Sequence, residues 1–573
     1  MKKIFLVTLF IMLSCSGFAA TYYSRVATGN FATVSTWSVN RSGTPTNATA
    51  LTAADIFIIQ TGNSITLAAN QSANQITIES GGSLAPNNNR TLTLTNPLII
   101  ESGGTLSLTT RTLTFGASSL ENSGSITGST GEISRTTGTF TNTATGTVTI
   151  SGAAAFVMGT GDFINNNTSS SVNFGSSPIT ISGTANQSIG GFTTTGRFTA
   201  SKTAGTTTLT GGINAGGITK SGAGILDMGS STHTTTNTVI LTAGTMNGGS
   251  STINVNITST TAWQGTASVF VPEASTVNFG GVAQTLSATG TKTFYNLTLS
   301  NSGVKTIAST TVNNILSMEG DATASVAPTY GANATLRYNT ANPRTVGPEW
   351  LATFVATGGV IIDNTGEITT NGNKVFDLDV PLTINSGATL SPTAGNTFSF
   401  GGDLINDGTW TASTGAVTIN QARANQLIGS FSTSGLVTMS KASETATFTG
   451  NINGGAFTMN GAGTLDLGTG LTHTFTGDWT NTAGALQGNT STLNIGGTGS
   501  VTSGTFTAGT STVHFNGTGA QDIPAFTYYQ LILSGSGAKT ILTGTTVTVN
   551  TIEIQNGPTL DLAGTAILNI TQP

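Results

Sequence analysis

Apolar and polar residues alternate in short runs along most of the chain. The runs around Ile76-Thr77-Ile78 and Leu106-Ser107-Leu108 are typical, with Thr or Ser placed between aliphatic residues. A period of two puts successive side chains on opposite faces of an extended backbone, so each run predicts a short strand with one buried face. Outside the N-terminal segment, no stretch of ten or more residues has helical periodicity. The pattern therefore predicts an all-β fold.

The strand pattern repeats at a nearly constant spacing. The segment 76–84 (ITIESGGSL) matches 98–106 (LIIESGGTL), and LENSGSI at 120–126 follows the same scheme. The Ser-Gly or Asn-Gly step in each repeat favours a corner, because glycine accepts positive φ without a steric cost. A unit of about 20 residues cannot bury its apolar row alone, but stacked coils can. We therefore predict a right-handed parallel β-helix (β-solenoid) of about 25 coils.

A longer duplication lies on top of the short repeats. Residues 186–192 match 425–431 and residues 222–229 match 461–468, each pair 239 positions apart, while 295–300 matches 529–534. These matches predict two arrays derived from one ancestor. The resulting division is a signal peptide in 1–19, an N-terminal cap with the first strands in 20–70, β-solenoid coils in 71–174, repeat array copy 1 in 175–320, a spacer module in 321–372, further coils in 373–414, and repeat array copy 2 in 415–573.

The N-terminus is typical of an export signal. Lys2 and Lys3 precede a short apolar run over 4–13, and small residues before Ala20 favour cleavage after Ala19. An alternative is a lipoprotein signal, in which Cys15 carries the lipid of an outer-membrane anchor. Cys15 is the only cysteine, so disulfides and cysteine metal sites are not expected. No later segment is apolar enough to predict a transmembrane helix.

The charge content narrows the possible functions. Only 7% of residues are charged, and the net charge of −5 is spread over 573 residues. Disordered chains usually carry a high net charge, so this composition favours a folded protein with neutral polar surfaces. No basic patch is present to hold a phosphate backbone, and we expect no nucleic-acid partner.

One set of motifs occurs twice in the chain. The first copy has VNFGG at 277–281 with Gln284, YNLTL at 295–299 and KTI at 305–307, and the second copy lies at 513–517, 529–533 and 539–541. These segments resemble the β-strand repeats of surface proteins from gliding Gram-negative bacteria with type IX secretion. The resemblance implies a parallel β-helix exported to the cell surface, with an adhesive or structural role.

The strongest candidate for catalysis is a group of carboxylates. Asp377 and Asp379 are two positions apart, so on one strand they would share a face, and Asp363 could lie one coil below. Such a cluster could hold calcium or act as the acid–base pair of a polysaccharide lyase or glycoside hydrolase. Solvent-facing alternation on one strand explains the same spacing and is the preferred interpretation.

Aromatic and imidazole side chains offer weaker candidates. Trp263, Trp350, Trp410 and Trp479 could form a platform for glycans if several were exposed on one face, although core packing is the simpler expectation. His233, His473 and His514 lie on Thr-rich strands without metal-ligand spacing, and we expect them on the surface. The recurrent Asp227, Asp466 and Asp561 are expected to be structural. No motif predicts a cofactor or a metal.

The sequence as a whole predicts a non-enzymatic, secreted or cell-surface β-solenoid. We expect an adhesive or structural role in which an extended polar face contacts extracellular polysaccharide or matrix. The alternatives are a polysaccharide-acting β-helix enzyme that uses the Asp cluster, and a passive stalk of a larger surface protein.

Overall fold

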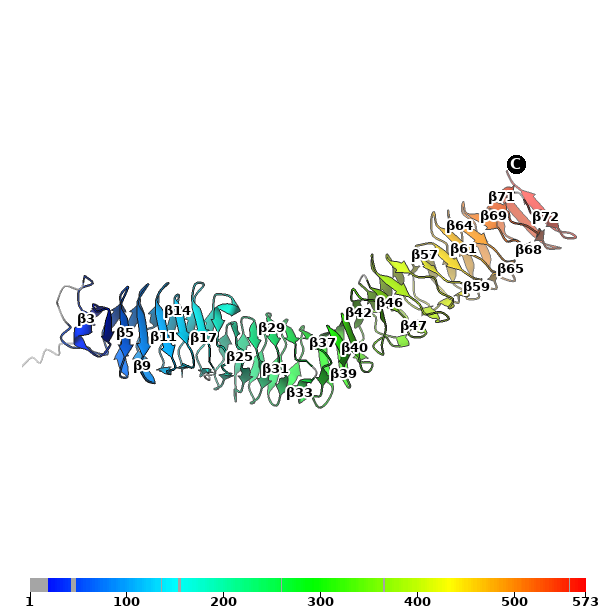
Figure 1. The fold of residues 1–573 in the computed structure, drawn as a ribbon. Helices are drawn as coiled ribbons and strands as arrows, with labels where there is room; N and C mark the ends of the chain where they lie inside the picture. Colours follow the sequence, from blue (N-terminus) through cyan, green and yellow to red (C-terminus); the bar gives the residue numbers. More distant parts are fainter. Residues whose placement is uncertain are drawn as a thin grey trace, which may run out of the picture. The chain divides into compact units, whose positions relative to one another are not determined.

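The computed structural model describes residues 19–42, 48–135, 137–152, 156–258, 260–363, 366–555 and 557–572, with backbone only for 156–158. Cys15 and nearly all of the predicted signal peptide lie outside these residues. Strands hold 49% of the residues and helices 2%, and the chain forms a parallel β-solenoid of about 25 turns. The predicted parallel β-solenoid and its predicted number of coils are confirmed. Figure 1 shows the strands of successive coils stacked within each part of the chain.

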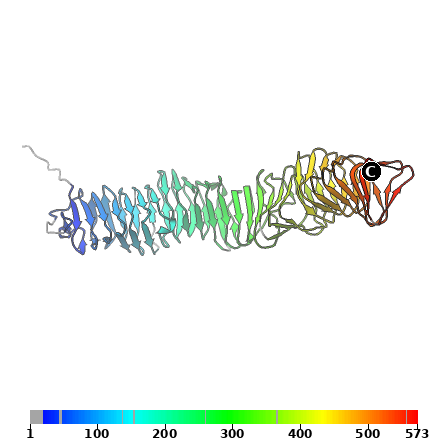
Figure 2. The same cartoon turned by 90° about the horizontal axis from the view of Figure 1, so that it is seen from above.

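The chain forms two compact units, Met1–Ser251 and Thr252–Pro573. In the first unit each coil contributes strands to three parallel ladders, and Figure 2 shows these strands from above. One ladder includes β4 (Ile56–Ile59), β7 (Gln75–Ile78), β10 (Leu98–Ile100) and β13 (Leu120–Asn122). The next includes β5 (Ser64–Leu67), β8 (Ser83–Pro86), β11 (Thr105–Thr109) and β14 (Ser125–Gly128). The third includes β6 (Gln71–Ala73), β9 (Arg90–Leu94), β12 (Leu113–Phe115) and β15 (Ile133–Arg135).

The register of the ladders explains the sequence repeat. Leu98 of β10 pairs with Ile76 of β7 and with Leu120 of β13, so equivalent residues stand directly above one another. All three are fully buried. Burial of one such side chain contributes about 1.5–3 kcal/mol, and the stacked rows form the core that a single coil lacks. The corner between strands needs positive φ, which Gly103 supplies at 85°.

The first coil of this unit has an aromatic centre. β1 (Thr21–Ser24) pairs in parallel with β4 and antiparallel with β3 (Trp37–Ser38), which follows the short 3-10 helix η1 (Val34–Thr36). The ring centroids of Phe31, Trp37 and Phe57 lie 4.7–5.0 Å apart. These packed rings fill the interior of the segment predicted to be the N-terminal cap.

In the second unit the predicted spacer consists of ordinary solenoid coils. β42 (Thr335–Asn339) and β45 (Val360–Ile362) are its expected strands, and they lie in one ladder with β39 (Thr310–Glu319) and β48 (Leu382–Ile384). Leu336, Val360 and Leu382 are stacked and fully buried. The coils before and after residues 321–372 are therefore joined by the same ladder.

One face of the second unit contains a break in its ladder. A sheet formed by β43 (Arg344–Thr345), β46 (Glu367–Thr369), β49 (Thr389–Ser391) and β52 (Thr409–Trp410) ends at β52. A new sheet starts at β55 (Phe431–Ser432), which pairs with β58 (Ile452–Gly454). Among the described residues, a single bridge between Ser413 and Thr433 joins the two coils on this face, while parallel strand pairs join them on the other faces.

Candidate functional site

The structure places the three candidate carboxylates at two different corners of the coil. Asp363 follows β45, whereas Asp377 and Asp379 follow β47 (Lys374–Phe376), which belongs to another ladder. The expectation that Asp377 and Asp379 share a strand face is wrong, because the strand ends at Phe376 and both residues lie in the turn. Asp379 has a φ of 63°, in the left-handed region, and lies at the corner where the chain turns after β47.

Asp363 and Asp379 are each paired with a cation. Asp363 accepts hydrogen bonds from Asn385 (2.9 Å) and from Nε of Arg337 (2.9 Å), and these bonds lower its pKa, that of Asn385 foremost. Arg423 bridges Asp379 and Asp403 at 2.8 Å each. A carboxyl held in its ionised form has no proton to donate, so Asp363 is unsuited to the general-acid role in glycosidic cleavage.

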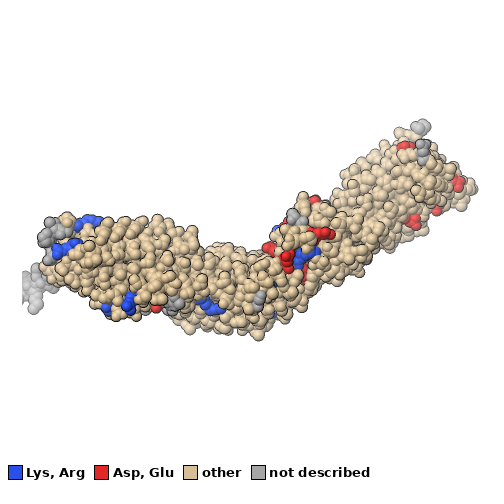
Figure 3. All heavy atoms as spheres, in the orientation of Figure 1, with Lys and Arg blue, Asp and Glu red and all other residues tan. Residues whose placement is uncertain are grey.

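The charged side chains of this region form a surface patch and no metal centre. Figure 3 shows acidic and basic residues gathered on one part of a face that is otherwise nearly uncharged. Ion pairs in this region join Arg337 to Asp363 and, at the other corner, Arg423 to both Asp379 and Asp403. Within the described ranges, no group of three or more His, Cys, Asp or Glu side chains is arranged to hold a metal ion. The described residues thus give no support to calcium binding by these aspartates, which was the alternative to solvent-facing carboxylates.

The four candidate tryptophans are core residues. Their exposed fractions are 1% for Trp263, 2% for Trp350, 7% for Trp410 and 2% for Trp479. Trp479, for example, stacks on Phe457 with ring centroids 3.9 Å apart. The interpretation of these rings as a glycan platform is wrong, because each side chain is at most 7% exposed and its ring packs against other aromatic side chains.

Two of the three histidines are buried, contrary to the expectation of surface positions. His233 and His473 are both 0% exposed. In His233, Nε2 donates to the carbonyl of Met228 (2.8 Å) and Nδ1 accepts from the amide of Ile213 (3.3 Å). His473 repeats these contacts with Leu467 and Ile452. Each imidazole forms hydrogen bonds with one backbone carbonyl and one backbone amide that the strand ladders do not pair. The role of these two histidines is therefore structural.

The burial of these histidines predicts that the protein is less stable in mild acid. Burial lowers the pKa of both side chains below the ordinary value of 6.5. Between the lowered pKa and the ordinary one, the unfolded chain binds more protons than the folded chain. The stability that the two neutral imidazoles contribute is therefore complete above about pH 6.5 and is lost as the pH falls below that value.

Urea unfolding followed by circular dichroism at pH 7.5 and at pH 5 measures this loss. The double variant His233→Gln, His473→Gln should show a smaller difference in the free energy of unfolding between the two pH values. An equal difference in the variant and the unsubstituted chain would contradict the assignment.

All seven lysines of the described residues are buried. Their exposed fractions run from 0% to 5%, for Lys202, Lys220, Lys292, Lys305, Lys374, Lys441 and Lys539. Their ammonium groups donate to backbone carbonyls at the corners; Lys220, for example, contacts the carbonyls of Gly222 (2.8 Å) and Ala243 (3.1 Å). Burial lowers the pKa of each, to about 8 for Lys305 and Lys374. These lysines satisfy carbonyls that the turns leave unpaired.

A buried glutamine accompanies four of these lysines. Lys202 donates to Gln187 Oε1 (3.3 Å), and Lys441 donates to Gln426 Oε1 (3.0 Å), 239 positions later. The same pairing joins Lys305 to Gln284 and Lys539 to Gln521. The constant Gln-to-Lys spacing in the first two pairs is a sequence signal for this arrangement, although the sequence alone did not reveal its structural role.

A second buried polar group lies in the predicted spacer. Glu349 is 0% exposed and accepts hydrogen bonds from the hydroxyl of Tyr338 (3.0 Å) and the amide of Gly347 (2.9 Å). Arg344 lies 3.7 Å from its carboxylate, and Nζ of Lys374 lies 5.2 Å from the ring centre of Trp350. Since the set is closed to solvent, it does not offer a surface for substrate.

The recurrent aspartates behave as turn residues. Asp227 accepts a hydrogen bond from the amide of Gly229 (2.9 Å), and Asp466 accepts the equivalent bond from Gly468 (2.7 Å). Such bonds from a side chain to the backbone two residues on are typical of Asx turns. The structural role expected for these two aspartates is confirmed.

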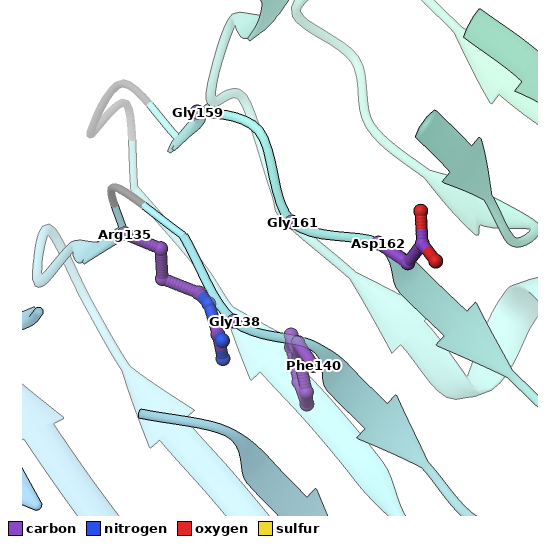
Figure 4. Close-up of a pocket in the computed structure, with 6 residues that line it drawn as sticks. All are labelled: Arg135, Gly138, Phe140, Gly159, Gly161 and Asp162. Atoms are coloured by element: carbon purple, nitrogen blue, oxygen red, sulfur yellow. The ribbon is translucent and has the colours of Figure 1, made fainter. Parts of the chain in front are cut away.

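A small internal void lies beside Arg135. Figure 4 shows Arg135 and Phe140 from one coil and Asp162 from the next, with the Asp162 carboxylate directed away from the guanidinium. Arg135 donates to the carbonyl of Ser118 (2.9 Å), and burial lowers its pKa to about 10. The void measures about 10 Å³, which is about the space that one water molecule needs. It is too small for a substrate.

The outer face of the second unit carries a regular row of hydroxyl groups. In the ladder of β50 (Phe398–Phe400), β53 (Val417–Ile419), β56 (Val437–Met439), β59 (Phe457–Met459), β62 (Trp479–Asn481) and β65 (Gly499–Val501), the middle residue of each strand points outward. These residues are in register, and they are Ser399, Thr418, Thr438, Thr458, Thr480 and Ser500. The row repeats at the spacing of the coils, about 4.8 Å.

Comparison with known proteins gives no further guide to the chemistry. No model of a known protein family matches the chain, and no curated protein matches it in sequence.

Proposed function

We propose that this chain is a non-enzymatic, secreted or cell-surface β-solenoid that adheres to extracellular polysaccharide or matrix through its extended polar face. The hydroxyl row from Ser399 to Ser500 carries the proposal. A row of identical donors and acceptors at one spacing suits a polymer with repeating hydroxyl groups, since many weak contacts then add up along its length.

The position of the charges supports a neutral partner. Every lysine in the described ranges is turned inward, so the outer strand positions present mainly Thr, Ser and Asn. A surface of this kind has little electrostatic attraction for phosphate or sulfate polymers. The hydroxyl groups of a neutral glycan can instead donate hydrogen bonds to this surface and accept them from it. Such binding buries no charged group without a partner.

Export is part of the proposal. It rests on Lys2, Lys3, the apolar run over 4–13 and the cleavage site after Ala19, with lipidation of Cys15 as the alternative route to the outer membrane. The repeats that resemble those of type IX secretion substrates favour the cell surface as the destination. Among the described residues, no helix has the length and hydropathy to cross a membrane.

Incubation of the mature chain with insoluble polysaccharides tests the proposal. We expect retention on at least one neutral polymer in a pull-down, with no new reducing ends and no unsaturated products. The substitutions Asp377→Ala and Asp379→Ala should leave retention within about twofold, because these carboxylates lie outside the hydroxyl row. Bond cleavage that either substitution abolishes would contradict the proposal and favour the polysaccharide-acting enzyme. Lack of retention on every polymer would favour a passive stalk.

A further inference from the structure

The ladder break of the second unit holds an open groove. Its lining includes Thr409, Ser432, Asn451 and Asn453 together with Trp410 and Phe431, and its volume is about 280 Å³. This is close to the lower end of small-molecule sites, about 300 Å³. The groove lies where β52 ends one sheet and β55 begins another.

Several polar groups in the groove have unused hydrogen-bonding capacity. The side chains of Thr409, Ser432 and Asn453 make no hydrogen bond to other described residues, and Thr409 and Asn453 are exposed. Asn451 uses its Oδ1 to accept from the amide of Thr472 (2.9 Å), which leaves its Nδ2 free to donate. Hydroxyl and amide groups that both donate and accept match the hydroxyl groups of a sugar.

The remaining walls of the groove combine two aromatic rings with a hydrogen bond between neighbouring coils. Asn406 donates to the carbonyl of Ser430 (2.6 Å) and so holds the two coils together at the groove. Trp410 and Phe431 pack with ring centroids 5.9 Å apart. None of the lining side chains is ionisable, so a charged ligand would find no counter-charge there.

The matched position in the first unit lacks two of these side chains and the ladder break. Gly191 and Gly212 stand 239 positions before Ser430 and Asn451, and the Ser169 hydroxyl donates to the carbonyl of Gly212 (2.6 Å). The ladder is also unbroken there, because β20 (Val172–Asn173), β23 (Phe192–Thr193) and β26 (Ile213–Ala215) pair in sequence. Asn214 and Thr193 are the counterparts of Asn453 and Ser432 and therefore provide matched controls.

We propose that the groove between β52 and β55 is a binding subsite for a neutral oligosaccharide, which the free groups of Thr409, Ser432, Asn451 and Asn453 recognise through its hydroxyls. The inference rests on the proposed function and adds to it one defined point of contact. The hydroxyl row supplies weak contacts along the polymer, while the groove selects one segment of it.

Titration calorimetry on the full chain tests the subsite with hexasaccharides of cellulose, laminarin, xylan and mannan, and with hexagalacturonate as a charged probe. We expect at least one neutral hexasaccharide to bind. Asn453→Ala should weaken its binding about five- to tenfold, the effect of one or two neutral hydrogen bonds. Ser432→Phe should abolish binding because its ring fills the groove. The controls Asn214→Ala and Thr193→Phe should leave affinity within about twofold of the unsubstituted chain.

Two results would overturn the subsite. One is a set of groove variants that bind like the unsubstituted chain, and the other is binding of hexagalacturonate alone. Retention of the chain on insoluble polysaccharide distinguishes a failure of the subsite from a failure of the proposed function. If the chain is retained while the groove variants have no effect, the subsite is wrong and the adhesive role remains. If the unsubstituted chain binds neither polymer nor hexasaccharide, the proposed function fails as well.

Discussion

Amine-directed acylation of the folded chain is expected to leave its seven described lysines almost unmodified. Each is at most 5% exposed, and its ammonium group is held by corner carbonyls or a glutamine. The reagent reaches such a group only after the coil opens locally. If opening costs about 3 kcal/mol, labelling slows about 100-fold relative to a free surface amine.

The measurement is peptide mass spectrometry after a short reaction at pH 8.5. The α-amino group of the chain serves as an internal standard for an accessible amine, and the same reaction in guanidinium chloride should label every lysine. Lys305 and Lys374 are the strictest cases, because their pKa of about 8 leaves them largely unprotonated at this pH. Rapid labelling of these two in the folded chain would contradict their burial.

Replacement of Trp479 by alanine should strongly destabilise the folded chain. The indole is 2% exposed, stacks on Phe457 at 3.9 Å and meets the edge of Phe475 at 5.2 Å. Truncation of a buried Trp to Ala typically costs about 3–5 kcal/mol, since it leaves a cavity that the neighbours fill only in part. The coils stack one on another, so the loss should also destabilise the coils on either side.

The first unit offers a matched control for this substitution. Val239 pairs with Ile218 as Trp479 pairs with Phe457, and Val239 is fully buried. Val239→Ala removes two methyl groups and should cost about 1.6 kcal/mol. Urea unfolding followed by far-ultraviolet circular dichroism compares the two variants. Equal midpoints for Trp479→Ala and Val239→Ala would show that the aromatic stack does not stabilise the second array.

The alternating pattern was sufficient to predict the fold. Rows such as Ile76, Leu98 and Leu120 repeat at the length of one coil, and only stacking buries them all. Side chains within a strand obey a local rule, so the inward and outward positions can be read directly from the sequence.

The polar interior could not be read from the same rule. His233 and Lys220 bind carbonyls of neighbouring turns, and those partners are set by how one coil lies on the next. The turn at Asp377 and Asp379 likewise depends on where β47 ends, which strand propensity does not define within two residues. The groove between β52 and β55 arises where one sheet ends and the next begins. No local sequence pattern predicts where such a break in the strand pairing occurs.

The central claim is that the uncharged outer face of the protein binds a neutral polysaccharide without cleaving it. The most direct test is whether retention of the protein on an insoluble neutral polysaccharide depends on salt. The mature chain is incubated with the polymer at about 0.05 M and about 1 M sodium chloride, conditions that change the screening length from roughly 14 Å to 3 Å. We expect equal retention at both concentrations and no soluble sugar products. Retention that disappears in high salt, or the release of reducing ends, would contradict the proposed adhesive role.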